Sequence, residues 1–234
     1  MNSTKATAHR AGVLYFLLMI GGILGEFFFP AFMAPGDAAA TARNITGAEA
    51  MYRITILNGF VTQVIFIFLV VILYKLLKDV DKIQALLMVL LVSIGISVSL
   101  ANLIHKFAPL VLLGGADYLS VFTRPELEAL TLSILRLHSS GLTVIIAFWG
   151  LWLFPFGILV IRSGFLPRVL GILLLVAGFA YLTSSVTSLM LPMYSKVISR
   201  FMMPLYFGEV PIIFWLLIKG ARVPQSQSES SQVG

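Results

Sequence analysis

Long apolar stretches alternate with short polar connections along this chain. Because the hydrocarbon core of a bilayer is about 30 Å thick, a helix needs about 20 mostly apolar residues to cross it. Stretches of this kind occupy residues 11–33, 53–77, 83–106, 138–161, 168–191 and 201–218. The pattern therefore predicts an all-α polytopic membrane protein, built as a bundle of six transmembrane helices.

Composition supports this class. Of the 234 residues, 59% are hydrophobic and 11% are charged, and the mean hydropathy is +1.00. So little polar surface cannot cover a soluble globule of this size, so the lipid bilayer is the expected surrounding. We expect one transmembrane domain over residues 1–222 and a disordered cytoplasmic tail over residues 223–234, which are rich in serine and glutamine.

The charge and the cysteine content of the chain exclude further kinds of site and partner. The chain has no cysteine, which excludes disulfides and thiolate metal sites. Its net charge of +6 is spread among predicted helix ends without a basic arm, so no nucleic-acid partner is expected. Anionic lipid headgroups are the natural partner for such charge.

The connections predict the orientation of the bundle. Basic residues in the short connections 75–82 and 162–168 favour the inside of a plasma membrane by the positive-inside rule, which places both termini in the cytoplasm. The longer connection, Phe107 to Leu137, is then extracytoplasmic. Within it Arg124 and Pro125 mark a helix start, and the segment is predicted to form a short helical lid between the third and fourth spans.

Two glutamates, Glu26 and Glu209, stand inside apolar spans. An acidic residue near the centre of a transmembrane helix costs roughly 2.5 to 3.5 kcal/mol on insertion scales, so it usually faces the bundle interior and finds a partner. Pro204 and Pro211 flank Glu209 and predict a kink there. We expect both carboxyl groups to point into the bundle, near a shared cavity and a basic residue.

Further polar side chains belong to the same predicted outer half of the membrane. In helix 3 the spacing of Asn102 from Gly95, Ser99 and Lys106 places one polar stripe on the interior face. The predicted substrate-binding set consists of Glu26, Asn58, Asn102, His105, Arg136, His138, Tyr181 and Glu209. The first hypothesis is thus an outward-facing pocket that binds a small molecule, a lipid headgroup or protons.

Two other hypotheses stay open at this stage. One is an intramembrane enzyme at the outer headgroup layer, with a glutamate or His138 as general base; its catalytic residues cannot be assigned. The other is a structural or regulatory subunit whose polar residues only hold helices together, and a homo-oligomer fits the small size. No zinc-binding spacing accompanies His105 and His138, so neither a metal nor another cofactor is expected.

Several strings of residues resemble a known family. They are Gly150-Leu-Trp-Leu-Phe-Pro-Phe-Gly157, Arg162-Ser-Gly-Phe-Leu-Pro-Arg168, the glycines at 171 and 178, and the Gly-Glu pairs at 25–26 and 208–209. Together they resemble the uncharacterised prokaryotic membrane family catalogued as domain of unknown function 4386, over nearly the whole chain up to about Gly220. The resemblance implies a multi-pass membrane protein without an assigned activity, with Glu26, His138 and Glu209 as motif positions.

Overall fold

The computed structural model describes residues 3–221, without the side chains of Ser3 and Glu26. The tail expected over residues 223–234 lies outside this part of the chain. The described residues form helices and short connections, and they contain no strand. The α-helices are α1 (Ser3–Phe28), α2 (Ala38–Gly47), α3 (Glu49–Leu77), α4 (Lys82–Leu103), α5 (Ala108–Leu112), α6 (Arg124–Leu151), α7 (Leu153–Arg162), α8 (Arg168–Met190), α9 (Ser195–Tyr206) and α10 (Val210–Ile218).

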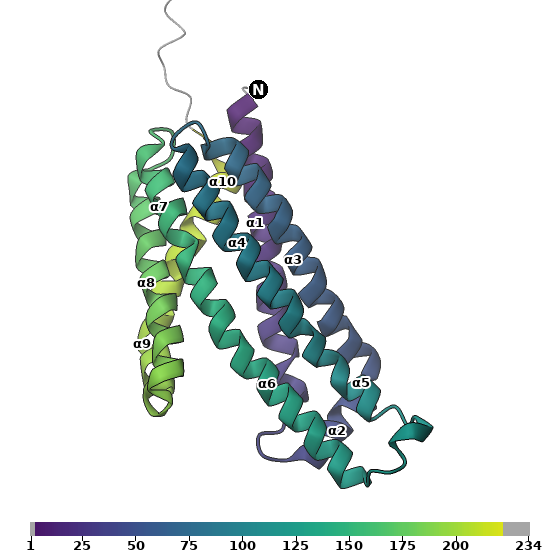
Figure 1. Ribbon diagram of the computed structural model, residues 1–234. Coiled ribbons are helices and arrows are strands. Elements are labelled where there is room, and N and C mark those ends of the chain that lie inside the picture. The colour runs from purple at the N-terminus through teal and green to yellow at the C-terminus, as the bar shows by residue number, and fades with distance from the viewer. Residues whose placement is uncertain (1–2, 222–234) are drawn as a thin grey trace, which may run out of the picture.

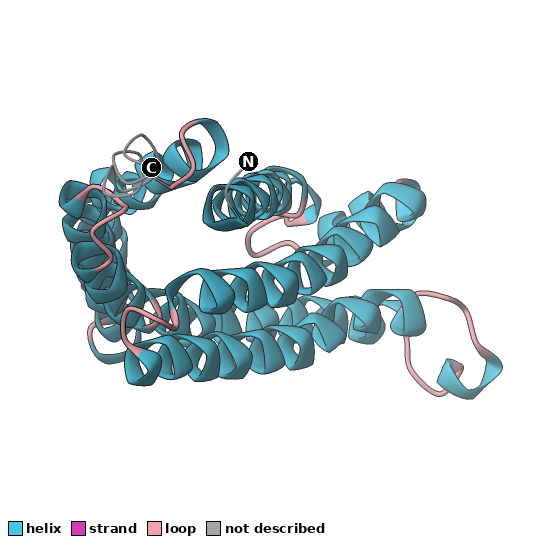
Figure 2. Cartoon of the chain, turned by 90° about the horizontal axis from the view of Figure 1, so that it is seen from above, coloured by secondary structure: helices cyan, strands magenta, loops and turns pink. Residues whose placement is uncertain are grey.

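The six predicted spans are confirmed. Six helical stretches among the described residues are long and apolar enough to cross a membrane: Thr4–Phe32, Glu49–Leu77, Lys82–Leu112, Arg124–Arg162, Arg168–Met190 and Pro192–Ile218. They form one bundle in which α1 packs against α3 and α10, α3 against α4, and α8 against α6, α7 and α9 (Figures 1 and 2). The number, length and apolar character of these helices identify the chain as a multi-pass membrane protein.

The fourth span starts earlier than the apolar pattern predicts. A capping box begins α6, because the Thr123 amide donates to Glu126 Oε2 at 2.7 Å and Pro125 occupies the first turn. The helix then continues without a break into the apolar stretch. The lid helix expected to start at Arg124 is thus the first half of α6, and the separate helical elements of the Phe107–Leu137 segment are α5 and a 3-10 turn at Asp117–Leu119. At 1.5 Å per residue, the 39 residues from 124 to 162 extend roughly 58 Å, well beyond a bilayer core.

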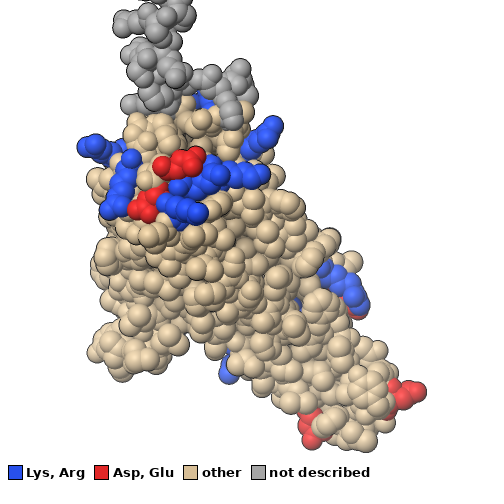
Figure 3. Space-filling view, turned by 45° about the horizontal axis from the view of Figure 1, so that its top comes forward, with Lys and Arg blue, Asp and Glu red and all other residues tan. Residues whose placement is uncertain are grey.

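The two ends of the bundle differ. At one end, named the basic end here, lysines and arginines gather over the α3–α4 and α7–α8 connections (Figure 3). At the other end, α2 and α5 pack against the start of α6 (Figure 1). This α2 end has its own small apolar cluster of buried side chains: Phe29, Phe32, Ile45, Tyr52, Ile56 and Leu135. The larger apolar core fills the rest of the bundle.

Glycines bring α6 and α7 against α8. The backbone oxygen of Gly178 would lie 2.8 Å from a Cβ atom built on Gly150, and that of Gly171 would lie 2.8 Å from one built on Gly157. Seven residues separate the two glycines on each side, so the two contacts repeat along one helix face. The glycines of the family-like strings therefore serve close helix packing.

The predicted kink in the last span is also confirmed. Helix α9 contains Pro204 and ends at Tyr206, a 3-10 turn covers Phe207–Glu209, and α10 follows with Pro211 in its first turn. The break lets α9 pack on α8 while α10 crosses to α1 (Figure 1). Glu209 consequently stands between α1 and α8.

Candidate functional site

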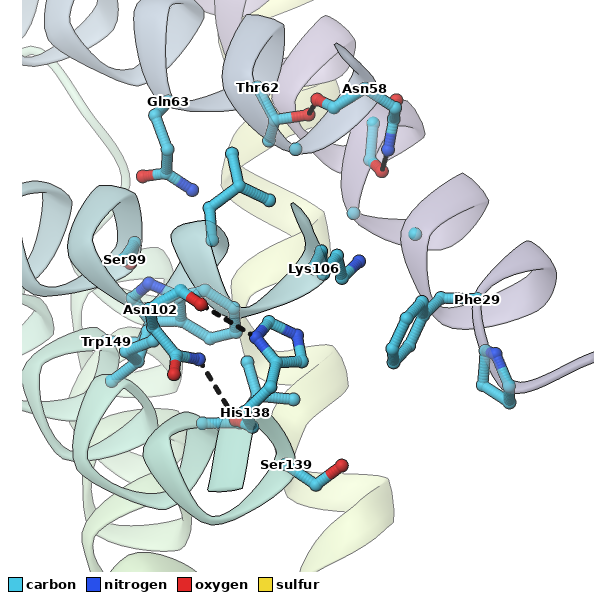
Figure 4. Close-up of a pocket in the computed structure, with 18 of the residues that line it drawn as sticks. Phe29, Asn58, Thr62, Gln63, Ser99, Asn102, Lys106, His138, Ser139 and Trp149 are labelled. Atoms are coloured by element: carbon cyan, nitrogen blue, oxygen red, sulfur yellow. Dashed lines mark hydrogen bonds between the residues drawn. The ribbon is translucent and has the colours of Figure 1, made fainter. Parts of the chain in front are cut away.

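A cavity of about 360 Å³ lies between α1, α3, α4 and α6, in the half of the bundle nearer the α2 end (Figures 1 and 4). The part of α4 that borders it is the last turns, where polar residues follow one another on the interior face. The lining residues are Gly21, Gly22, Gly25, Phe29, Pro30, Met33, Asn58, Gly59, Thr62, Gln63, Ser99, Asn102, Leu103, Lys106, His138, Ser139, Leu142, Ile145 and Trp149.

Five of the lining side chains are both polar and buried: Gln63, Ser99, Asn102, Lys106 and His138. They come from α3, from the end of α4 with the 3-10 turn that follows it, and from α6. Burying such groups inside an apolar bundle is costly unless they find partners. Their gathering around one cavity makes this the leading candidate site in the described part of the chain.

Asn102 and His138 form a reciprocal pair between α4 and α6. The Asn102 side-chain amide donates to the His138 carbonyl at 3.0 Å, and His138 Nδ1 lies 3.0 Å from the Asn102 carbonyl oxygen (Figure 4). A carbonyl oxygen only accepts, so Nδ1 must carry the proton. In the neutral ring, Nε2 is therefore a hydrogen-bond acceptor.

The end of α4 explains why this carbonyl is available. Regular helix stops at Leu103 and a 3-10 turn covers Ile104–Phe107. His105 Nδ1 also lies 3.0 Å from the Asn102 carbonyl oxygen. This oxygen thus accepts hydrogen bonds from two imidazole rings. His105 itself is half-buried and does not line the cavity.

Lys106 brings an ammonium group into the site. Its side chain is 7% exposed, and it is the one buried lysine or arginine among the described residues. Nζ lies 3.8 Å from the centroid of the Phe29 ring, a cation–π contact worth about 2 kcal/mol when desolvated. The Tyr52 hydroxyl donates to the Lys106 carbonyl at 2.9 Å and fixes the backbone there.

Gln63 carries the clearest unsatisfied group. Its side chain is 9% exposed, and its Oε1 atom has no hydrogen-bond partner among the described residues. Figure 4 shows the amide beside the space that Lys106 and Asn102 border, with its nitrogen on the side of Lys106 and its oxygen on the opposite side. A buried acceptor without a donor costs about 1 to 3 kcal/mol. Gln63 Oε1 is thus an unsatisfied acceptor within the wall of the cavity, and His138 Nε2 is a second acceptor in the same lining.

Three described residues of the predicted substrate-binding set line the cavity. Asn58 lines it and donates to the Gly21 carbonyl at 2.9 Å, and Asn102 and His138 line it as described. Sequence reasoning left out Gln63, because it lies off the polar stripe that Thr55, Asn58 and Thr62 form on one face of α3. Glu26 was predicted here too, but its side chain lies outside the described residues.

Glu209 occupies a different place. The Tyr15 hydroxyl donates to Glu209 Oε1, and Tyr181 is a second hydrogen-bond partner. Tyr181 in turn stacks on Tyr206 with 4.6 Å between ring centroids. No ion pair in the described part of the chain includes Glu209, so the expected basic partner is wrong for this residue. The kink turns Glu209 toward tyrosines of α1 and α8, away from basic helix ends.

Arg136 lies apart from both groups. It is exposed on α6 and does not line the cavity. Among the side chains that the structure describes, which exclude Glu26, no three histidine or acidic residues come together in a way that could hold a metal ion. The polar groups that line the cavity are amides, hydroxyls, an imidazole and an ammonium group.

Comparisons with known proteins give a family without an activity. The model of the family described as domain of unknown function (DUF4386) matches residues 10–220. An uncharacterized protein of Archaeoglobus fulgidus is 24% identical over 161 residues, which cover 67% of this chain and 94% of that protein. No solved structure matches this chain at a significant level.

Proposed function

This chain belongs to the family described as domain of unknown function (DUF4386), and we propose that it binds a small ligand in the cavity between α1, α3, α4 and α6. One observation carries the proposal: Gln63 Oε1 is buried beside the cavity without a partner. His138 and Lys106 stand around the same space. Rotation of the amide by 180° would turn this oxygen toward the cavity, where a ligand that donates to Gln63 would satisfy it.

The alternative use of these residues is to hold helices together. The Asn102–His138 pair does serve that purpose, since both hydrogen bonds join α4 to α6. Such interhelical contacts contribute about 0.6 kcal/mol on average in membranes. Helix association does not require a cavity, nor a buried amide oxygen left without a donor. These two features favour ligand binding over a purely structural role.

We also propose that the protein lies in the plasma membrane with both termini in the cytoplasm, so that the cavity is in the extracytoplasmic half. The distribution of charge supports this orientation. Five acidic residues lie at the α2 end, and two of them pair locally, Glu49 with Arg53 and Glu128 with Arg124. Among the described residues, the acidic residues of the basic end are Asp79 and Asp81, which stand against its lysines and arginines, as positive-inside sorting favours.

A thermal-shift experiment on the purified full-length protein in detergent tests the proposal. The probes are glycerol, glycerol 3-phosphate, ethanolamine and short-chain phospholipids, because their hydroxyl or amino groups can donate to the two acceptors. A ligand at a hundred times its dissociation constant stabilises the folded state by about 2.7 kcal/mol. At least one probe should therefore raise the unfolding midpoint.

Two glutamine variants make the result specific. Gln63→Leu should remove the stabilisation by the probe. Gln84→Leu, a matched change on α4 near the basic end and away from the cavity, should keep it. If no probe shifts the wild-type protein, or if both variants behave alike, the ligand-binding proposal is wrong and the structural reading of the polar residues replaces it.

A further inference from the structure

The cavity has a closed side and an open side. Toward the α2 end it meets the apolar cluster that includes Phe29, Tyr52 and Leu135, whose side chains are buried. Among its lining residues, Gly22 on α1, Pro30 just after α1 and Ser139 on α6 are exposed. The exposed lining residues on the membrane helices thus belong to α1 and α6.

These two helices do not rely on each other for packing. Helix α1 packs on α3 and α10, whereas α6 packs on α4, α8 and α2. On either side of the cavity, large apolar residues such as Ile23 and Leu137 are more than half exposed. In a membrane helix such residues face lipid. The cavity therefore opens sideways, into the apolar layer.

We propose that the ligand is a membrane amphiphile which enters sideways between α1 and α6 and whose head carries hydroxyl or amino hydrogen-bond donors. This inference rests on the proposed ligand binding. The head would donate to His138 Nε2 and, after rotation of the Gln63 amide, to Gln63 Oε1. A volume of about 360 Å³ is near the lower limit of ligand pockets, so the chains of the amphiphile stay in the opening and the bilayer.

The glycines of α1 fit this path. A Cβ atom built on Gly22 meets no atom within 4 Å, so this position borders open space. By contrast, one built on Gly21 would lie 2.4 Å from Thr62 Oγ1. Gly21 lets α1 approach α3, whereas Gly22 leaves the opening clear. A large side chain at position 22 can therefore obstruct the opening without displacing a neighbouring helix.

Two adjacent serines on α6 provide a matched test. Both are exposed, and each hydroxyl donates to the carbonyl four residues earlier at 3.1 Å: Ser139 to Leu135 and Ser140 to Arg136. Only Ser139 lines the cavity. Leucine at position 139 obstructs the opening, whereas leucine at position 140 changes the helix by the same chemistry outside it.

The experiment measures lipid binding to the full-length protein by native mass spectrometry from detergent. Phosphatidylglycerol and phosphatidylethanolamine carry donors in their heads, whereas phosphatidylcholine carries none and is the control lipid. The wild-type protein should bind the first two at least tenfold more tightly than the third. Ser139→Leu and Gly22→Leu should each weaken that binding at least tenfold, and Ser140→Leu should leave it unchanged.

Two controls distinguish failure of this inference from failure of the ligand-binding proposal. They are the unfolding midpoints of all variants and the binding of the water-soluble probe glycerol 3-phosphate. Equal binding of the three lipids, or equal binding by Ser139→Leu and Ser140→Leu in folded proteins, overturns the sideways entry of a donor-bearing amphiphile. If glycerol 3-phosphate still binds in a manner that depends on Gln63, the cavity retains its proposed function and only this inference fails. If neither lipid nor soluble probe binds the wild-type protein, both fail.

Discussion

Replacing Gly171 by alanine should destabilise the bundle through one contact that the structure defines. An added Cβ atom would lie 2.6 Å from the backbone oxygen of Gly157 and 2.6 Å from Ile161 Cγ1. Ordinary contacts of a Cβ atom begin at about 3.4 Å, so the helices must separate by several tenths of an ångström. Overpacking of this kind typically costs 1 to 3 kcal/mol.

Gly22→Ala is the matched reference. Both positions lie within helices, so both substitutions gain the same helix propensity, up to about 1 kcal/mol. At position 22 the added carbon meets nothing within 4 Å, and this gain is the whole effect. The difference in unfolding free energy between the two variants therefore isolates the steric term, which we expect to be about 1 to 3 kcal/mol.

The assay is unfolding of both variants in the same detergent micelles, followed by helical circular dichroism and by tryptophan fluorescence. Gly22→Ala should be at least as stable as the wild-type protein, and Gly171→Ala clearly less stable. Because the glycines of α7 and α8 face each other, a Gly157→Ala change added to Gly171→Ala should cost less than the two single changes together. Equal stability of Gly171→Ala and Gly22→Ala would refute the close-packing argument.

Three further changes test other parts of the structure. Asn102→Leu should cost about 0.5 to 1.5 kcal/mol, measured by the same unfolding assay, because it removes the hydrogen bond that the Asn102 side chain on α4 donates to the His138 carbonyl of α6. Glu209→Gln should be nearly as stable as the wild-type protein, since the amide oxygen can still accept a hydrogen bond from Tyr15. Glu209→Leu should lose about 1 to 3 kcal/mol of unfolding free energy. Equal losses in the two variants would contradict the tyrosine contacts. In this cysteine-free chain, Val121→Cys should react with an impermeant thiol reagent on intact cells and Asp79→Cys should not, and the reverse result would invert the proposed orientation.

The helix count follows from sequence because lipid imposes a length on every span. All six predicted stretches became membrane helices, and the proline pair around Glu209 correctly predicted the break in the last one. The start of the fourth span could not be obtained in this way. The residues between Arg124 and Leu137 are mixed in polarity, so hydropathy separates them from the span, whereas the capping box at Thr123 begins one helix that includes both.

Sequence was less informative about which polar residues meet. Stripe spacing within a helix correctly put Asn102 on an interior face, but it does not fix how neighbouring helices are rotated. Gln63 is the example: it lies away from the stripe of Asn58 on α3, yet it faces the same cavity because that cavity also borders α4. Its unpartnered oxygen becomes visible only once the neighbouring helices are in place.

Glu209 shows how depth alone can mislead. The sequence places Glu209 and His138 in the same half of the bundle, which suggests one shared site. The broken last helix instead directs Glu209 to Tyr15 and Tyr181, while His138 faces a cavity bounded by α1, α3, α4 and α6. A carboxyl group satisfied by tyrosine hydroxyls has an adequate structural reason to be in the bundle. The unpartnered oxygen of Gln63 has no such partner among the described residues, and for that reason a ligand is expected at the cavity.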